Sequence, residues 1–245
     1  MPDLPTPPHP AGAEVSHGSQ RPATPGSAPE YEQPLVSIDV VPVTYADEEL
    51  RICLAPRINP PHLGELALPG VLLGRERSVD AAQRALRVKA RVEDTRGIYF
   101  RDIGVFDDPG RDPRGPTMAV VKLAVLSPDV EAGVRVPVTA IPALPFDHRS
   151  IIDASVYALQ GWMWRDRTVT RALLGESFSA RDAARVERAL ATATGGSGAE
   201  VNVANLKRRL LATGWVRQTD RLSAAPAHGG RPSYLWEWVE EDPEP

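Results

Sequence analysis

Two arginines three positions apart, Arg111 and Arg114, lie in a short loop of residues 106–115 that also holds two prolines and two glycines. A planar guanidinium can donate two parallel hydrogen bonds to one phosphate, so this pair could hold a diphosphate or a ribose phosphate. On composition alone, a solvated turn with alternating charge is the better interpretation. Both interpretations stay open at this point.

A second set of basic residues could bind a nucleic acid. Residues 200–231 contain Lys207 and arginines 208, 209, 217, 221 and 231 against only two acidic residues, a net charge of +4 in a chain whose total is −4. Basic side chains concentrated in this way can neutralise DNA phosphates. If Lys207 to Arg209 stood alone, the solvated face of an amphipathic helix would be the better interpretation.

The elements expected around this basic segment favour the DNA interpretation. A short helix is expected over residues 168–174, and Ser179 with Asp182 should cap an alanine-rich helix ending near residue 193. A second helix over residues 202–213 should bury four positions and end at Gly214, the four being Val203, Leu206, Leu210 and Leu211.

Two short strands, 215–218 and 234–238, then enclose a loop with Arg221, paired glycines and Arg231. Helix, turn, basic helix and basic hairpin is the layout of a winged helix-turn-helix. We expect this domain over residues 168–240. Its DNA contacts should be made by Asn205, Lys207, Arg208, Arg209, Arg221 and Arg231.

The first half of the chain predicts a different, α/β structure. Valine and isoleucine dominate residues 35–45 and 50–54, which we expect to form a hairpin around an acidic turn. A strand over 66–70 should enter a helix over 79–90, with Ser78 as its N-cap and Asp80 in its first turn. Strands over 97–106 and 118–126 follow, and a largely apolar helix over 150–164 should connect the two domains or form a dimer seam. Strands on both sides of the helix over 79–90 predict an α/β sandwich.

The segment Leu68–Val92 resembles the metal-binding loop and helix of the Nudix hydrolases. Gly70, Glu76, Arg84 and Leu86 keep the frame G-x5-E-x7-R-E-U-x-E-E-x-G-U of that family. Where the family has three glutamates and a late glycine, this chain has Ala85, Val88, Lys89 and Arg91.

The changed positions decide what chemistry remains in this segment. Val79, Ala82, Leu86 and Ala90 are expected to form the buried face of this helix. Positions 85, 88 and 89 are three or four residues apart, so we expect them to lie together on a different face. Mg²⁺ requires oxygen ligands, which methyl, isopropyl and ammonium groups do not supply. We therefore predict no catalytic residue, no metal and no metal-dependent hydrolysis of a diphosphate. Glu76 and Arg84 are expected to form an ion pair or capping contact that holds the loop on the helix.

Several motifs in a specific order narrow the resemblance further. The altered Nudix frame, the loop 111–115, the junction Phe146-Asp147-His148, the stretch 205–211 and Gly230-Arg231-Pro232 closely resemble the Nudix-related transcriptional regulators of NAD metabolism. This resemblance implies a homodimeric repressor, whose Nudix-like domain senses ADP-ribose or a related nucleotide and whose winged helix binds the operators of NAD biosynthesis or salvage genes. Effector and operator would be coupled through the dimer geometry. The residues expected to contact the effector are Arg57, Arg111, Asp112 and Arg114.

Composition supports a soluble protein without an internal disulfide. Cys53 is the only cysteine, no apolar run is long enough to span a bilayer, and no signal peptide is evident, so we expect a cytoplasmic protein. Residues 1–34 hold nine prolines and little to bury, which predicts a disordered tail. The expected organisation is this tail, a Nudix-like sensing domain over 35–147, a linker helix over 148–167, and the winged helix.

Two other functions remain open from the sequence. The first is a hydrolase of ADP-ribose or a related nucleoside diphosphate derivative, which turnover of ADP-ribose with Mg²⁺ would reveal. The second is an inactive Nudix scaffold that binds a protein partner, which would show no salt-dependent binding to DNA.

Overall fold

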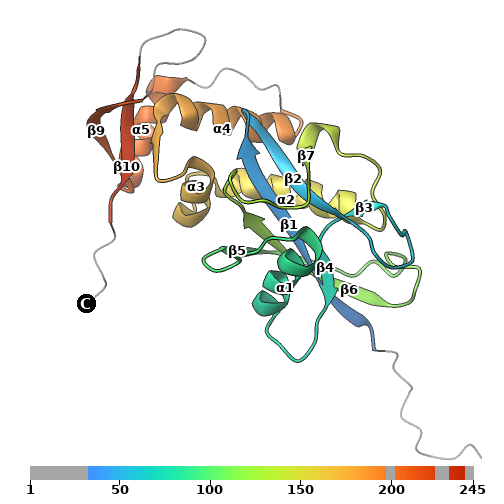
Figure 1. The fold of residues 1–245 in the computed structure, drawn as a ribbon. Coiled ribbons are helices and arrows are strands. Elements are labelled where there is room, and N and C mark those ends of the chain that lie inside the picture. Colours follow the sequence, from blue (N-terminus) through green and yellow to red (C-terminus); the bar gives the residue numbers. More distant parts are fainter. Residues whose placement is uncertain (1–32, 197–201, 224–231, 241–245) are drawn as a thin grey trace, which may run out of the picture. The chain divides into compact units, whose positions relative to one another are not determined.

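The longest strand, β1 (Leu35–Ala46), runs through the middle of the main sheet. Its composition, rich in valine and isoleucine, favours an extended chain. β1 turns into β2 (Glu49–Pro56) through Asp47 and Glu48, which both have positive φ, the geometry of a tight hairpin turn. The predicted hairpin is therefore confirmed in this computed structural model (Figure 1), which describes residues 33–196, 202–223 and 232–240.

Within the described residues the main sheet has seven strands, in the order β3-β2-β1-β6-β5, with β4 also pairing with β1 and β7 with β2. β1 and β6 are parallel, and the other pairs are antiparallel. The remaining elements of this part are β3 (Leu66–Ala67), β4 (Gly70–Leu72), α1 (Ser78–Ala90), β5 (Phe100–Phe106), β6 (Thr117–Val125), β7 (Val134–Pro137), the 3-10 turn η1 (Val138–Ala140) and α2 (His148–Trp162).

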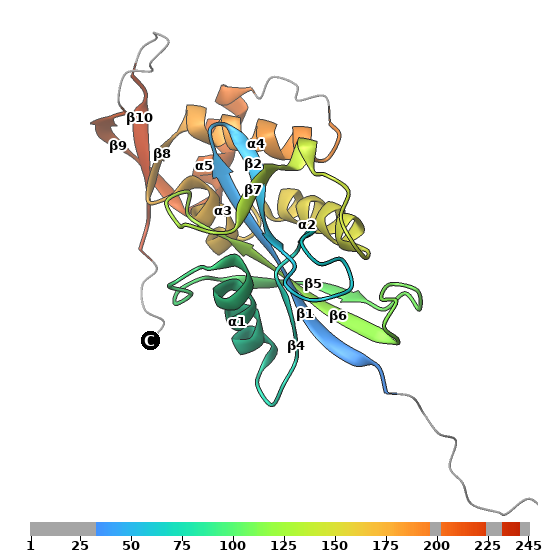
Figure 2. The ribbon, with the colours of Figure 1, turned by 45° about the vertical axis from the view of Figure 1, so that its right-hand side comes forward.

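Helices cover both faces of this sheet (Figures 1 and 2). The side chains of β1 alternate between them: Ile38 and Val40 pack in the cluster under α1, whereas Val41 and Val43 pack in the cluster that contains α2. The predicted α/β sandwich is confirmed. The expected strand over 66–70 is instead two short strands, because β3 pairs with β2 and β4 pairs with β1.

The helix α1 departs from the prediction in two details. Ser78 is its first residue and not its N-cap; Arg77 takes the cap position without a capping side chain and pairs with Asp80 instead. Ala85 was expected to lie with Val88 and Lys89, but it is fully buried under the sheet. That expectation was wrong because the buried face of α1 is wide enough to include Ala85 beside Ala82 and Leu86.

The second part of the chain is built around a small three-stranded sheet, in the order β8-β10-β9 among the described residues. Its elements are α3 (Arg167–Leu174), β8 (Ser177–Ser179), α4 (Ala180–Ala193), α5 (Val203–Thr213), β9 (Val216–Leu222) and β10 (Tyr234–Trp238). Apart from β8, this is the succession of helices and strands that the sequence predicts for this part of the chain. The predicted capping box of Ser179 and Asp182 and the left-handed Gly214 that ends α5 are both present.

The buried face of α5 is narrower than predicted. Leu206 and Leu210 are fully buried against α4 and β9, but Val203 is 41% and Leu211 61% exposed. The expectation that all four face inward was wrong, because a short helix at the edge of a domain contacts its neighbours along a single line of residues. Paired glycines and Arg231 of the expected wing lie outside the described residues, as does the predicted tail up to residue 32.

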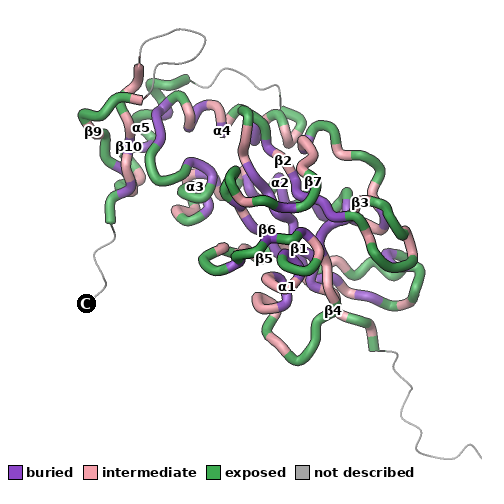
Figure 3. The backbone as a smooth tube through the Cα atoms, viewed as in Figure 1, coloured by how far each residue is buried: buried purple, intermediate pink, exposed green. Residues whose placement is uncertain are grey.

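One apolar core cluster contains residues from both parts. Figure 3 shows the buried stretches of the backbone in purple. The cluster runs from Val41 and Val43 in β1 through α2 to Phe178 and Trp236 in the small sheet. Ion pairs add to this contact: Arg101 on β5 lies 2.7 Å from Asp166 at the start of α3, and Arg185 on α4 lies 3.3 Å from Glu48 in the β1–β2 turn. The domain boundaries expected from the sequence remain predictions. None of the described helices is long and apolar enough to cross a membrane.

Candidate functional site

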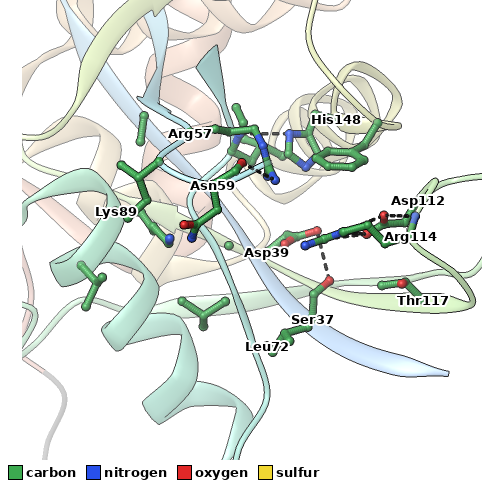
Figure 4. Close-up of a pocket in the computed structure, with 18 of the residues that line it drawn as sticks. Ser37, Asp39, Arg57, Asn59, Leu72, Lys89, Asp112, Arg114, Thr117 and His148 are labelled. Carbon is green, nitrogen blue, oxygen red and sulfur yellow. Dashed lines mark hydrogen bonds and ion pairs between the residues drawn. The ribbon is translucent and has the colours of Figure 1, made fainter. Parts of the chain in front are cut away.

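A pocket of about 420 Å³ opens between β1, the end of β2, α1 and the loop that joins β5 to β6 (Figure 4). All four residues predicted to contact an effector line it: Arg57 follows β2, and Arg111, Asp112 and Arg114 come from the β5–β6 loop. The parallel pairing of β1 with β6 brings this loop to the same end of the sheet as the start of β1. The structure thus brings the four residues together, and their contact with a ligand stays a prediction.

Arg111 differs from Arg57 and Arg114 because it is buried. Its Nε and Nη2 atoms donate to the two carboxylate oxygens of Asp147 at 2.9 and 2.8 Å, and Nη2 also lies 3.4 Å from Asp39. Only 4% of the side chain is exposed. The guanidinium therefore ties β1, the β5–β6 loop and the start of α2 together. We expect Arg111 to hold the pocket in shape, with few donors left for a ligand.

Asp39 forms part of the pocket floor, where its carboxylate lies beside Gly70. It stands opposite Gly70 in the β1–β4 pair, and a Cβ atom on Gly70 would lie 2.2 Å from the Asp39 carboxylate. A side chain at position 70 would therefore displace this carboxylate from its place in the pocket floor. Burial raises the pKa of Asp39 to about 6, although Arg111 acts in the opposite direction.

Arg57 and Arg114 place two positive charges around one aromatic ring. The guanidinium carbon of Arg57 lies 4.7 Å from the ring centre of Phe146, and that of Arg114 lies 5.9 Å from it. Burial and the nearby Arg114 both lower the pKa of Arg57. Arg57 donates to the carbonyl of Pro61, while Arg114 is held by Asp112. An anion placed between the two arginines would relieve their repulsion.

His148, the first residue of α2, is buried in the pocket wall beside Phe146. Its Nδ1 atom accepts a hydrogen bond from the backbone N–H of Leu68 at 3.1 Å, so the ring proton resides on Nε2. Desolvation lowers the pKa of His148 to about 4. From its position just before the apolar helix over 150–164, the sequence predicts that His148 is a capping or packing residue. The contact with Leu68, which fastens the start of α2 to the main sheet, fits that prediction.

The face of α1 that lines the pocket carries no metal ligand. Val88 and Lys89 point to the pocket, and neither side chain offers an oxygen atom. Among the described residues, no three His, Cys, Asp or Glu side chains come together as a metal site would require. Arg84 pairs with Glu76 and donates to the carbonyl of Leu72 at 2.9 Å. This confirms the predicted contact that holds the loop on the helix.

Three residues that line the pocket were not predicted from the sequence to be part of a ligand site. Phe146 was part of a motif without an assigned function, His148 was assigned to packing, and Asp39 was not considered. A signal for Asp39 was present, because a charged residue inside a strand of valines and isoleucines needs a partner when that strand is buried. Phe146 carries no such signal, since its place between two arginines depends on segments far apart in the sequence.

The other candidate site is the outer face of α5. Asn205, Lys207, Arg208 and Arg209 are all exposed, on the side away from Leu206 and Leu210. Asn202 caps the start of the helix through its side chain. Arg208 donates to the side chain of Asn205 on the preceding turn. The structure therefore leaves four of the predicted DNA contacts on the exposed surface of α5.

Two of the predicted DNA contacts, Arg209 and Arg221, are already paired with carboxylates. Arg209 is ion-paired with Glu187 on α4, and the indole of Trp164 donates to the same carboxylate. Arg221 lies on β9, is 63% exposed, and pairs with Glu237 on the neighbouring strand. Arg231 lies outside the described residues. A phosphate would have to compete with a carboxylate for Arg209 and for Arg221.

Comparison with known proteins supports the fold assignment. NrtR from Shewanella oneidensis, solved in complex with a 27mer DNA, is similar over 83% of this chain and 93% of its own, with a TM-score of 0.66 and 22% identity. A MutT/nudix family protein from Enterococcus faecalis is similar over 87% of this chain and 90% of its own, with a TM-score of 0.65 and 22% identity. These likenesses establish the fold: a Nudix-like sandwich followed by the helices and small sheet described above.

One curated relative matches part of the chain in sequence. An ADP-ribose pyrophosphatase from Methanocaldococcus jannaschii is 29% identical over 132 residues, which is 50% of this chain and 73% of the relative. No family model matches the sequence. The resemblance to Nudix-related regulators that the motifs indicated is confirmed at the level of the fold.

Proposed function

We propose that this protein is a DNA-binding transcriptional regulator whose Nudix-like domain binds ADP-ribose or a related nucleotide without hydrolysing it. The observation that carries the proposal is the pairing of two sites in one fold: a pocket with cationic arginines and an α1 face without carboxylates, and an exposed basic face on α5. The likeness to the DNA-bound NrtR supports the second site, and the ADP-ribose pyrophosphatase relative supports the first. From the sequence resemblance we further propose a homodimeric repressor of NAD biosynthesis or salvage genes.

The structure offers a physical route between the two sites. α2 starts at the pocket, where Asp147 and His148 bind Arg111 and Leu68, and it ends at Trp162, against Arg101. Just beyond its end, Trp164 shares the Glu187 carboxylate with Arg209 of α5. A ligand that favours a different position of α2 would also change the position of α5, through the contacts of Trp164 and Arg209 with Glu187. Such coupling requires only that the ligand bind the two arrangements with different affinity.

Replacement of Arg208 by alanine is the direct test of the DNA site. We expect it to weaken binding to a selected operator by about 1–3 kcal/mol, and Arg209→Ala to have an effect in the same range. Sequences bound from a pool of random duplexes would be selected and then titrated in a gel-shift assay at several salt concentrations. Arg96→Ala in the sandwich, where Arg96 is 90% exposed and pairs with Asp94, is the matched control. Unchanged titrations for both α5 variants would show that this helix does not read DNA.

Hydrolysis is the competing function, because the relative matched in sequence is a pyrophosphatase. We expect ADP-ribose incubated with the protein and Mg²⁺ to be recovered intact, since Val88 and Lys89 replace the oxygen ligands that would hold the ion beside a diphosphate. Product analysis by chromatography provides the measurement, and an active Nudix pyrophosphatase serves as the positive control. Turnover at ordinary enzymatic rates would make the protein an enzyme.

A further inference from the structure

A second cavity, of about 660 Å³, adjoins the ligand pocket. It lies beyond the C-terminal end of α1 and is closed by the segment 128–133 and the start of β7. Both cavities are lined by Pro56, Ile58, Val88 and Lys89, so they meet along a shared wall. No residue of the predicted effector site lines the second cavity.

Part of the wall of this second cavity is apolar and exposed. Ile58 is 64%, Val88 59% and Val134 44% exposed, although side chains of this kind are usually buried in a folded domain. The three surround one hollow, which is the arrangement that binds a flat ring or an alkyl group. Charged side chains of both signs, among them Arg91 and Glu131, also line it.

The loop that closes the cavity is held firmly. Gly133 has a positive φ, and a Cβ atom there would lie 2.2 Å from the carbonyl oxygen of Leu54, so the loop lies directly on β2. The backbone N–H of Gly133 donates to the carbonyl of Ala90 at 2.8 Å, and Arg135 donates to that of Val130. The hollow is therefore shaped by fixed backbone contacts, which suits a preformed binding site.

Lys89 lines both cavities, and Arg57 lines the first pocket between Pro56 and Ile58, which line both; Figure 4 shows Arg57 and Lys89 in the first pocket. A diphosphate placed near these two cations would have one cavity on each side. We propose that the site binds an intact dinucleotide: one nucleoside in the first pocket, the diphosphate near Arg57 and Lys89, and the second base against Ile58, Val88 and Val134. This inference rests on the proposed nucleotide-sensing function and extends the ligand beyond ADP-ribose.

NAD⁺ and ADP-ribose are suitable probes, because they share the same adenosine, diphosphate and ribose and differ by one ring. By isothermal titration calorimetry we expect the wild-type protein to bind NAD⁺ roughly tenfold more tightly than ADP-ribose, through the apolar contact of that ring. Val134→Trp should fill the second cavity and remove this preference while leaving the affinity for ADP-ribose unchanged. Val134→Lys should act in the same direction, because its ammonium group would repel the cationic nicotinamide ring of NAD⁺.

Val105→Trp is the matched control, because Val105 is 52% exposed on the strand β5 and lines neither cavity. Equal unfolding midpoints for all variants would confirm that the substitutions leave the fold intact. An unchanged ratio of the two affinities in both Val134 variants would overturn the inference. Binding of ADP-ribose without NAD⁺ would also overturn it but leave the proposed function standing, whereas binding of neither ligand would overturn both.

Discussion

Replacement of Arg111 by alanine is expected to destabilise the folded protein by about 3–5 kcal/mol, because it leaves two carboxylates at the pocket floor without their cation. Asp39 and Asp147 are 8% and 19% exposed in side-chain area, so water cannot replace the guanidinium at either. Urea unfolding followed by tryptophan fluorescence would measure the loss. The matched control is Arg149→Ala on α2, where Arg149 and its partner Asp153 are 56% and 54% exposed and the ion pair should contribute about 1 kcal/mol or less.

The loss of folding stability caused by Arg111→Ala should depend on pH. Burial already holds the pKa of Asp39 at about 6, above its usual value, and removal of Arg111 would raise it further. When folding raises the pKa of a carboxyl group, the protonated form of that group stabilises the folded state. This contribution is fully present below the pKa of the unfolded state, and it is lost as pH rises through the pKa of the folded state. The variant should therefore lose more stability at pH 8 than at pH 5. Adding Asp39→Asn should recover part of the loss at pH 8; equal stability of Arg111→Ala and wild type at both pH values would contradict this account.

The role of Arg111 shows why the site was only partly predictable from sequence. Its residue type and loop indicated phosphate binding, and the same was true of Arg114 three positions later. What separates them is the position of Asp39, 72 residues away, and of Asp147, 36 residues away. No local pattern reports such partners. The motif was enough to predict that both arginines line the pocket. Only the fold shows that Arg111 is buried in ion pairs while Arg114 remains accessible.

Much of the fold could be predicted because its signals are local. The β1–β2 hairpin, the capping box of Ser179 and the terminal Gly214 each depend on residues within a few positions of one another. Errors arose where tertiary packing decides the outcome, as at Ala85, which is buried by the sheet, and Leu211, which no neighbouring element covers. The strand β8 was missed because three residues, Ser177–Ser179, are too few for an alternating pattern to appear.

Combined replacement of Arg57 and Arg114 by alanine is expected to weaken ADP-ribose binding by a hundredfold or more without a matching loss of stability. A charge-assisted hydrogen bond contributes about 1.5–3 kcal/mol, so each arginine should account for roughly a tenfold change or more. The wild-type pocket carries the repulsion between these two cations before any ligand binds, as the lowered pKa of Arg57 indicates. The double substitution removes that repulsion, which offsets part of the loss of the Arg114–Asp112 ion pair, so the loss of stability should be smaller than that of Arg111→Ala.

Isothermal titration calorimetry at fixed ionic strength would measure this loss, with Arg149→Ala as the matched control because Arg149 is 56% exposed on α2 and lines neither cavity. Arg57→Lys separates charge from geometry: it keeps a cation at the pocket but loses the planar fork that matches two phosphate oxygens, so its affinity should fall between those of wild type and Arg57→Ala. Wild-type affinity in the double variant would mean that the diphosphate lies elsewhere. Together with Arg111→Ala, these variants separate two roles among the three arginines of one pocket. Arg111 is buried between its two carboxylates and stabilises the fold, whereas Arg57 and Arg114 are more exposed and repel each other until an anion binds.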